Sequence, residues 1–423
     1  MCKLLAMNRF RDIRPYEIEN NLVNLRQLVF EVTDACNLKC KYCGYGDLYY
    51  GYDKRESKYL SVNKAKLLLN YLSNIWNSSI TNEESPLTYI SFYGGEPLLN
   101  IAFIKEIIAY VENLQLKRNI LFSMTTNAML LDKYMDFLVE KKFSLLISLD
   151  GNRRAQSYRV KKTTGENSFD KVISNVKALQ AKYPKYFTEH VNFNSVLHNR
   201  NSVGGTYSFI KKNFNKETTI SELNNSEIRE DKLDEYDRTF RNKIESIKNS
   251  SNCEALEKKL FLGDPKTNDL LLFLHQYSGN VFKDYASFLV NPEKILSTNT
   301  GTCIPFAKKM FVTVNGKILQ CERIDHSFSL GSVSENEVHL DVNKIAKIFN
   351  KYLAKVRGQC SMCYRKRSCI QCFHYIPDIK SQHPSCLGFM DKKRYDIYCS
   401  YCLEHLAKYP ELYNKIMTKV RVD

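Results

Sequence analysis

The chain has 423 residues, of which 43% are hydrophobic and 12% aromatic, and this composition predicts a packed globular protein of two or three domains. Its apolar runs are shorter than the roughly 20 residues of a membrane-spanning helix, and charges interrupt the N-terminal segment where a signal peptide needs an apolar core, so we expect a cytoplasmic protein without a membrane partner. The formal net charge is +16, but the basic residues are spread along the chain. We therefore expect a peptide substrate with acidic segments rather than a nucleic-acid partner.

After an N-terminal extension of residues 1–27, residues 28–225 alternate short apolar segments with amphipathic ones, which is typical of repeated βα units. Helices are predicted at 61–76, 101–114 and 168–183. Strands are predicted at 25–33, 87–95, 119–127, 143–151, 189–198 and 218–225. This pattern predicts an α/β fold, a partial (β/α)6 TIM-like barrel, whose active site would gather at the C-terminal ends of the strands.

The rest of the chain has a different character. Residues 226–300 are charged and helical, and we expect a helical linker or insertion there. Residues 301–403 are rich in cysteine and predict a small α+β domain, followed by a C-terminal helix at 404–423. Twelve of the 14 cysteines fall in two blocks, 36–43 and 303–402, which favours local sets of metal ligands over disulfides in a reducing compartment.

The first block contains Cys36, Cys40 and Cys43, directly after the first predicted strand. Three thiolates can hold a [4Fe–4S] cluster and leave one iron without a protein ligand. They can also form part of a zinc site that a remote His or Cys completes. The spacing alone leaves both possibilities open.

The surrounding motifs favour the cluster. The stretch "CNLKCKYC" resembles the cluster motif of the radical S-adenosylmethionine (radical SAM) superfamily, and "GGEP", "TTN" and "SLDG" follow the next three predicted strands in the order found there. The resemblance implies that the open iron binds the amino and carboxylate groups of S-adenosylmethionine. A one-electron donor such as flavodoxin or ferredoxin would drive its cleavage to a 5′-deoxyadenosyl radical, which abstracts hydrogen from the substrate.

The resemblance also implies which residues bind S-adenosylmethionine. Gly94 and Gly95 would let the ligand approach the backbone, and Glu96 would face its ammonium group. Ser148 and Asp150, with Thr126 and Asn127 beside them, would accept from the ribose hydroxyls. The backbone of Tyr42 would meet the adenine, and Arg159 would bind the carboxylate. A His-Asp pair frequent in relatives is replaced by Gln156 and Ser157.

The second block, taken by spacing alone, favours zinc knuckles. Its order resembles the SPASM domain of radical enzymes that modify peptides, except that two residues rather than three separate Cys369 from Cys372. The resemblance implies two auxiliary [4Fe–4S] clusters. The distal one would be held by Cys360, Cys363, Cys369 and Cys386, and the nearer one by Cys303, Cys321 and Cys372. Whether Cys253, Cys399 or Cys402 completes the nearer set stays open.

Glu322 follows Cys321 and is a candidate catalytic base, because relatives that oxidise serine or cysteine carry an acid there; the alternative is a surface ion pair with Arg323 or Lys317. The "CGYGDLYY" segment resembles radical SAM peptide maturases of the Bacteroidales group, which act on precursors with double-glycine leaders. We therefore expect a precursor peptide as substrate and a crosslink or an oxidation as product. The alternatives are a sulfatase-type maturase that forms formylglycine and a non-enzymatic zinc-ribbon protein.

Overall fold

The computed structural model describes residues 10–81, 86–278 and 298–420. The chain divides into two compact units. The large unit consists of residues 16–250 and 305–342, and the small unit of residues 1–15, 251–304 and 343–423. Each unit is described separately below.

The large unit is built on a ten-stranded sheet, with the order β12-β11-β10-β9-β1-β3-β4-β5-β7-β8. Six consecutive neighbours, β1 to β8, are parallel. Their bounds are Gln27–Thr33, Leu87–Gly94, Asn119–Thr126, Ser144–Ser148, Val191–Val196 and Thr218–Ser221. These six strands confirm the partial (β/α)6 barrel predicted from the sequence.

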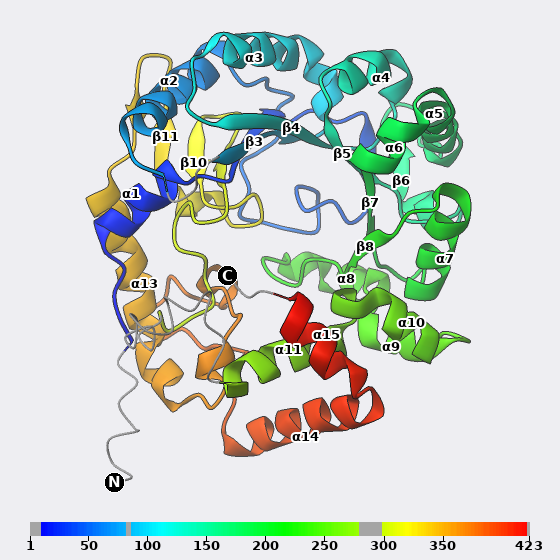
Figure 1. The fold of residues 1–423 in the computed structure, drawn as a ribbon, viewed down its shortest axis with the longest axis vertical. Helices are drawn as coiled ribbons and strands as arrows, with labels where there is room; N and C mark the ends of the chain where they lie inside the picture. The colour runs from blue at the N-terminus through cyan, green and yellow to red at the C-terminus, as the bar shows by residue number, and fades with distance from the viewer. Residues whose placement is uncertain (1–9, 82–85, 279–297, 421–423) are drawn as a thin grey trace. The chain divides into compact units, whose positions relative to one another are not determined.

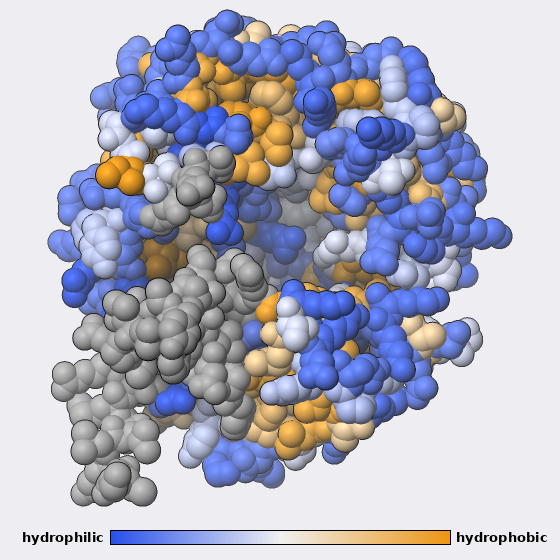
Figure 2. All heavy atoms as spheres, in the orientation of Figure 1, coloured by the Kyte–Doolittle hydropathy of each residue, from blue (hydrophilic) through white to orange (hydrophobic). Residues whose placement is uncertain are grey.

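Helices cover the outer side of this sheet, as Figure 1 shows. They are α1 (Pro15–Val23), α2 (Val62–Ser78), α3 (Ile101–Asn113), α4 (Leu131–Glu140), α5 (Phe169–Lys182), α6 (Pro184–His190) and α7 (Val203–Phe214). Each long helix buries one apolar face and leaves its polar face to water, as an amphipathic period predicts. On the face shown in Figure 2, hydrophilic side chains accordingly line much of the outer rim.

The centre of the sheet is buried on both sides. In β1, six of the seven residues are buried, as expected for a parallel strand covered on both faces. Trp76 of α2 is 1% exposed and donates through Nε1 to the carbonyl of Leu22 at 3.0 Å. The large unit therefore has a continuous core in which the chain's single tryptophan reports on folding.

Residues 305–342 extend the same sheet. Strand β9 (Met310–Val312) lies parallel to β1, and β10 (Lys317–Leu319), β11 (Gly331–Val333) and β12 (Val338–His339) follow as antiparallel neighbours. This segment falls within the range that the sequence assigned to the cysteine-rich domain. Helices α8 (Leu233–Thr239) and α9 (Lys243–Lys248) also belong to the large unit.

The small unit is helical. It contains α10 (Cys253–Leu260), α11 (Pro265–Ser278), α14 (Lys392–Lys408), α15 (Glu411–Lys419) and almost all of α13 (Val342–Met362). An apolar cluster joins α11, α14 and α15 through residues such as Leu270, Tyr398 and Ile416. Helices α8 to α11 lie within the predicted helical segment 226–300, of which residues 279–297 lie outside the described part of the chain. The domain limits predicted from the sequence are continuous segments, whereas each of the two compact units combines separate segments. The predicted limits therefore stay a prediction.

No helix in the described part of the chain is both long and apolar enough to cross a membrane.

Candidate functional site

The three cysteines of the first block lie on the loop that follows β1. The short strand β2 (Leu38–Cys40) pairs antiparallel with β6 (Arg159–Lys161), so that Cys40 lies opposite Arg159. Burial raises the pKa of the Cys40 thiol to about 12, and the charges of Cys43 and Cys36 act in the same direction. The backbone N–H of Leu38 also points at Cys36 Sγ, at 3.4 Å. The structure thus brings the three predicted ligands together.

The glycine pair after β3 packs against this loop. Gly94 has φ +136°, and a Cβ on Gly95 would lie 1.9 Å from the carbonyl oxygen of Ala35. In addition, the N–H of Gly95 donates to Thr33 O, and that of Glu96 to Ala35 O, each at 2.9 Å. The observed reason for glycine here is the close approach of the cysteine loop, whereas the approach of a ligand stays a prediction.

Glu96 ties the end of β3 to the end of β4. Its Oε1 accepts from Thr126 Oγ1 at 2.7 Å and its Oε2 from the N–H of Asn127 at 2.8 Å. The side chain is 1% exposed, and burial raises its pKa to about 7. Asn127 Nδ2 in turn donates to Asn37 Oδ1 at 2.8 Å. The predicted partner of Glu96 was an ammonium group, but both carboxylate oxygens here already accept from the protein's own donors.

Asp150 is the centre of a buried ionic cluster at the end of β5, two residues beyond Ser148, the last residue of that strand. Arg159 donates to Asp150 through Nε and Nη2, at 2.9 and 3.2 Å, and the Tyr42 hydroxyl donates to Asp150 Oδ2. Asp150 is fully buried and Arg159 is 7% exposed. Burial opposes ionisation of Asp150, but Arg159 and His198 outweigh it and hold its pKa below the usual range.

This cluster gives three of the predicted residues contacts with one another. Arg159 lies over the Tyr42 ring at 5.3 Å, so its guanidinium is shared between an aromatic face and a carboxylate. The predicted contacts of Asp150 with ribose and of Arg159 with a ligand carboxylate stay predictions. What the structure shows is that Asp150 and Arg159 fix the loop on which Cys40 and Tyr42 lie.

Sequence reasoning missed two members of this cluster. His198 follows β7, is fully buried and stacks on Tyr42, with ring centroids 5.3 Å apart and Nε2 3.8 Å from Asp150 Oδ2. Gln156 accepts through Oε1 from the N–H of Asp150 at 3.0 Å. Gln156 stands where relatives have a different residue, and that departure was the only signal in the sequence.

A group of tyrosines lies between the first cysteine block and Glu322, all within the large unit. Tyr45 and Tyr52 have ring centroids 4.9 Å apart. Burial raises the pKa of Tyr93, and the charges of Glu322 and Cys43 raise it further, so this phenol lies near both. The Tyr45 hydroxyl is buried and has no hydrogen-bond partner in the described structure. No motif in the sequence predicts a role for these tyrosines.

Glu322 pairs with Lys309 Nζ, at 3.0 Å, rather than with Lys317, which pairs with Asp53. Its side chain is 18% exposed. Burial opposes its ionisation, but Lys309 outweighs burial and lowers the pKa of Glu322. The alternative to a catalytic role was an ion pair of Glu322 with Arg323 or Lys317. Glu322 does form an ion pair, but with Lys309, and the catalytic role stays a prediction.

The small unit gathers most of the second cysteine block. Burial raises the pKa of Cys360 to about 11, and the charges of Cys369, Cys386 and Cys363 raise it too, so these four thiols converge. The N–H of Met390 points at Cys363 Sγ, at 3.4 Å. Such N–H···S contacts are typical of thiolate ligands.

Two cysteines of the other predicted set also meet in the small unit. A Cβ on Gly301 would lie 2.4 Å from the carbonyl oxygen of Cys369, so the loop before Cys303 presses against the loop before Cys372. The charge of Cys303 contributes to the raised pKa of Cys372, after the larger effect of burial. Cys321 belongs to the large unit. The full set predicted for the nearer cluster stays a prediction.

Two further cysteines lie in helix α14. Cys402 is fully buried in the apolar cluster of α11, α14 and α15, and Cys399 packs against that cluster. The environment of Cys402 is that of a buried structural thiol.

The chemical type of these ligands fits iron–sulfur clusters, which cysteine thiolates hold. In the described part of the chain, no three His, Cys, Asp or Glu side chains lie close enough to bind a single metal ion. The donor sets, 36/40/43 and 360/363/369/386, have the composition that such clusters require.

Comparison with known proteins defines the class. Residues 30–201 match the family model described as "Radical SAM superfamily", and this part of the chain has the fold of a radical SAM domain. Members of this superfamily use S-adenosylmethionine and a [4Fe–4S] cluster, and these are the cofactors of the domain.

Two curated relatives are informative. A "Cysteine-type anaerobic sulfatase-maturating enzyme" of Clostridium novyi is 30% identical over 193 residues, 45% of this chain and 48% of the relative. "Radical SAM cyclopropyl synthase TigE" of Paramaledivibacter caminithermalis is 26% identical over 179 residues, 41% of this chain and 35% of the relative. The chain thus spans about half or less of the length of these relatives.

Among solved structures, one described as "Native anSMEcpe with bound AdoMet" has a TM-score of 0.61 and 20% identity, and covers 93% of this chain and 99% of that one. This likeness extends beyond the radical SAM domain and concerns the fold.

Proposed function

We propose that this protein is a radical SAM enzyme that modifies a ribosomally made precursor peptide, with a double-glycine leader, by a crosslink (thioether, C–C or C–O) or an oxidation. The observation that carries this proposal is the placement of Cys36, Cys40 and Cys43 in the same unit as Tyr93 and Glu322. A radical source and a candidate proton acceptor would then act on one substrate residue.

Cys36, Cys40 and Cys43 would hold the cluster, and its open iron would bind S-adenosylmethionine. Together these cofactors would supply the radical that abstracts hydrogen from the substrate. The protein's own part is positioning. The Asp150–Arg159 pair holds β6, and with it the strand of Cys40, at the end of β5. Tyr45 and Tyr93 would line the substrate side, where their rings exclude water.

Glu322 would accept the proton that the modified residue loses. Its carboxylate is mostly buried and paired with Lys309, so binding of substrate would have to release it from that lysine. Such a base would complete an oxidation. When the substrate residue loses a hydrogen atom to the radical and a proton to the base, one excess electron remains on it, and an auxiliary cluster could accept that electron.

The auxiliary clusters would be held as the sequence resemblance implies. Cys360, Cys363, Cys369 and Cys386 would bind the distal cluster, and Cys303, Cys321 and Cys372 the nearer one. A flavodoxin or ferredoxin would supply electrons to the radical site. The convergence of the first four thiols in the small unit supports this assignment.

A second candidate is formation of formylglycine on a protein or peptide. The 30% identity to a sulfatase-maturating enzyme supports it, as does the carboxylate directly after Cys321. The two candidates differ in their products, because formylglycine is an aldehyde that reacts with a hydrazide probe, whereas a thioether crosslink shows only the loss of hydrogen.

The deciding experiment measures iron, sulfide and zinc in the protein reconstituted without oxygen, together with 5′-deoxyadenosine formed after dithionite reduction with S-adenosylmethionine. About twelve irons per chain, four for each of three cubes, are expected, and Cys40→Ala should abolish deoxyadenosine. Cys253→Ala is the matched control for the radical site, because Cys253 belongs neither to the 36/40/43 set nor to the distal set, and this variant should still form deoxyadenosine. Stoichiometric zinc without cleavage would overturn the proposal in favour of a zinc-ribbon protein.

A further inference from the structure

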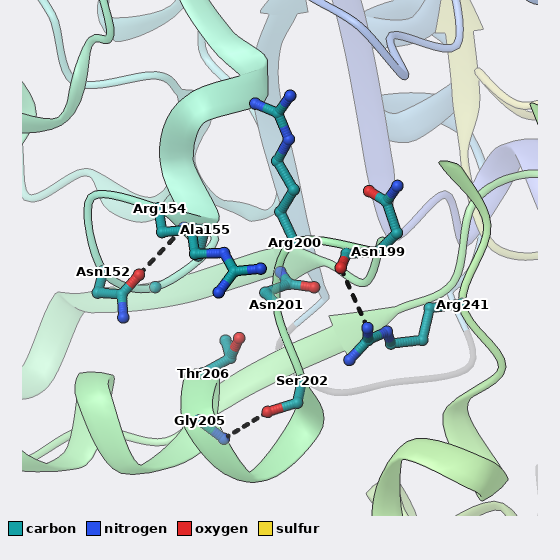
Figure 3. Close-up of a pocket in the computed structure, with 11 residues that line it drawn as sticks. Asn152, Arg154, Ala155, Asn199, Arg200, Asn201, Ser202, Gly205, Thr206 and Arg241 are labelled. Atoms are coloured by element: carbon teal, nitrogen blue, oxygen red, sulfur yellow. Dashed lines mark hydrogen bonds between the residues drawn. The ribbon is translucent and has the colours of Figure 1, made fainter. Parts of the chain in front are cut away.

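A pocket of about 380 Å³ lies beyond the ends of β5 and β7 in the large unit (Figure 3). The pocket is lined after β5 by Gly151, Asn152, Arg154 and Ala155, and after β7 by residues 199–202. The first turn of α7 and Arg241 complete the lining. Two loops from the C-terminal ends of neighbouring barrel strands therefore form it.

The lining is strongly positive. It includes Arg154, Arg200 and Arg241, and none of the described residues that line it is acidic. Arg200 is engaged elsewhere, since its Nη1 donates to Ser157 Oγ at 2.7 Å and its guanidinium lies 4.1 Å from the Tyr158 ring centre. Figure 3 shows its side chain running away from the other two. Arg154 and Arg241 are therefore the cations available to a ligand.

These two guanidiniums are not neutralised by the protein. Arg241 Nη2 donates to the carbonyl of Asn199 at 3.0 Å, a neutral acceptor. Within the described part of the chain, no hydrogen bond or ion pair reaches the Arg154 guanidinium. Arginine stays charged at any physiological pH, so a ligand with negative charge would remove the repulsion between them.

The start of α7 is not what makes this site. Ser202 caps the helix, accepting from the N–H of Gly205 at 3.1 Å, and the N–H of Val203 donates to Ser246 Oγ at 3.0 Å. The N–H of Thr206 donates to Ser202 O at 2.9 Å. Because these amides are already used, the pocket lacks the ring of free N–H groups with which helix termini hold phosphate. Its charged donors are guanidiniums, whose planar fork matches a carboxylate.

The pocket shares a wall with the cluster around Asp150. Asn201 Nδ2 and Thr206 Oγ1 donate to the backbone carbonyl of Asp150, at 3.2 and 3.0 Å. The side chain of the same residue accepts from Arg159. A group bound in the pocket would thus lie on the backbone side of Asp150, whose side chain holds Arg159 opposite Cys40.

We propose that Arg154 and Arg241 bind an aspartate or glutamate side chain of the peptide substrate. This inference rests on the proposed function, because it takes the ligand to be part of a peptide. The volume of about 380 Å³ accommodates a side chain with adjoining backbone and exceeds what one inorganic anion fills. The bound carboxylate would fix the register of the peptide relative to the radical.

The test is fluorescence anisotropy of a labelled peptide of alternating glutamate and alanine, titrated with the full-length reconstituted protein. A peptide with glutamine in place of glutamate is the ligand control. Arg154→Gln/Arg241→Gln is the test variant. Arg153→Gln/Arg238→Gln loses the same charge outside the pocket and is the matched control, since Arg153 pairs with Asp170 on the surface and Arg238 with a backbone carbonyl.

We expect the glutamate peptide to bind about ten-fold more weakly to the test variant, or about 1.4 kcal/mol, and nearly unchanged to the control variant. Equal losses in both variants, or no preference for glutamate over glutamine, would overturn the proposal. So would inorganic phosphate that binds through the same arginines while the glutamate peptide does not. The unsubstituted protein and the control variant should form equal amounts of deoxyadenosine without substrate. Its absence from both would count against the proposed function instead.

Discussion

Replacing Asp150 with asparagine is expected to destabilise the large unit by about 3 to 5 kcal/mol, the usual effect of breaking a buried ion pair. Asp150 is fully buried and Arg159 is 7% exposed, so Asp150→Asn leaves a guanidinium without its counter-charge where water cannot replace it. The side chain keeps its size and one acceptor oxygen, so the loss reports the charge rather than a cavity.

Removing the cation as well shows whether the loss of stability comes from the unpaired charge. Arg159→Met keeps most of the volume, and in Asp150→Asn/Arg159→Met no unpaired charge remains. The double variant should therefore be more stable than the sum of the single effects implies, by about 2 kcal/mol. Lys161→Met is the control on the same strand, because its pair with Glu166 is exposed and contributes at most about 1 kcal/mol.

Urea unfolding followed by tryptophan fluorescence suits this measurement. Trp76 is the only tryptophan and lies in the core of the large unit, so its emission reports this unit alone. Simple additivity of the two single effects would refute the claim that Asp150 and Arg159 stabilise the unit as a pair.

Three further predictions follow from the site. Gly95→Ala should lower iron uptake and destabilise the large unit by about 3 kcal/mol, because the new Cβ would collide with Ala35 O. Gly44→Ala is the control, since a Cβ at that position would have no atom within 4 Å. Equal iron content in both variants would contradict the packing argument. Burial raises the pKa of Glu96 from 4.5 to about 7, so the folded state holds this proton more tightly than the unfolded state and the stability of the large unit falls as the pH rises from 4.5 to 7. In unfolding followed by Trp76 fluorescence, Glu96→Gln should reduce the slope of this decline by up to about 1.4 kcal/mol per pH unit. An unchanged slope would show that Glu96 ionises normally. Cys402→Ala should keep its full iron content, because Cys402 lies in an apolar cluster. Cys363→Ala should lose about four irons. Loss of iron from Cys402→Ala would show that Cys402 is a cluster ligand.

The strands were predictable because each parallel strand is an apolar run of characteristic length, and the cysteine loop because its ligands are neighbours in the chain. The contacts of Asp150 were not predictable in this way. They join residues 42, 150, 159 and 198, and no local pattern specifies which buried charges meet. The glycine pair was correctly singled out, yet its observed neighbour is the backbone of Ala35, which a motif cannot reveal.

Strands β9 to β12 escaped prediction for a different reason. Each is two or three residues long, too short for an alternating pattern to be recognised. The pairing of β9 with β1 depends on a return of the chain after residue 305 that only the tertiary structure shows.

Because of that return, two separate segments of the chain, 16–250 and 305–342, form the large unit. A fragment ending near residue 225 would contain every motif of the radical SAM domain and still lack the neighbour of β1 on one side. Its exposed backbone amides and carbonyls would then be open to pairing with another molecule, and such an edge invites aggregation. Expression of the catalytic part therefore has to extend through residue 342, even though the recognisable sequence signature ends much earlier.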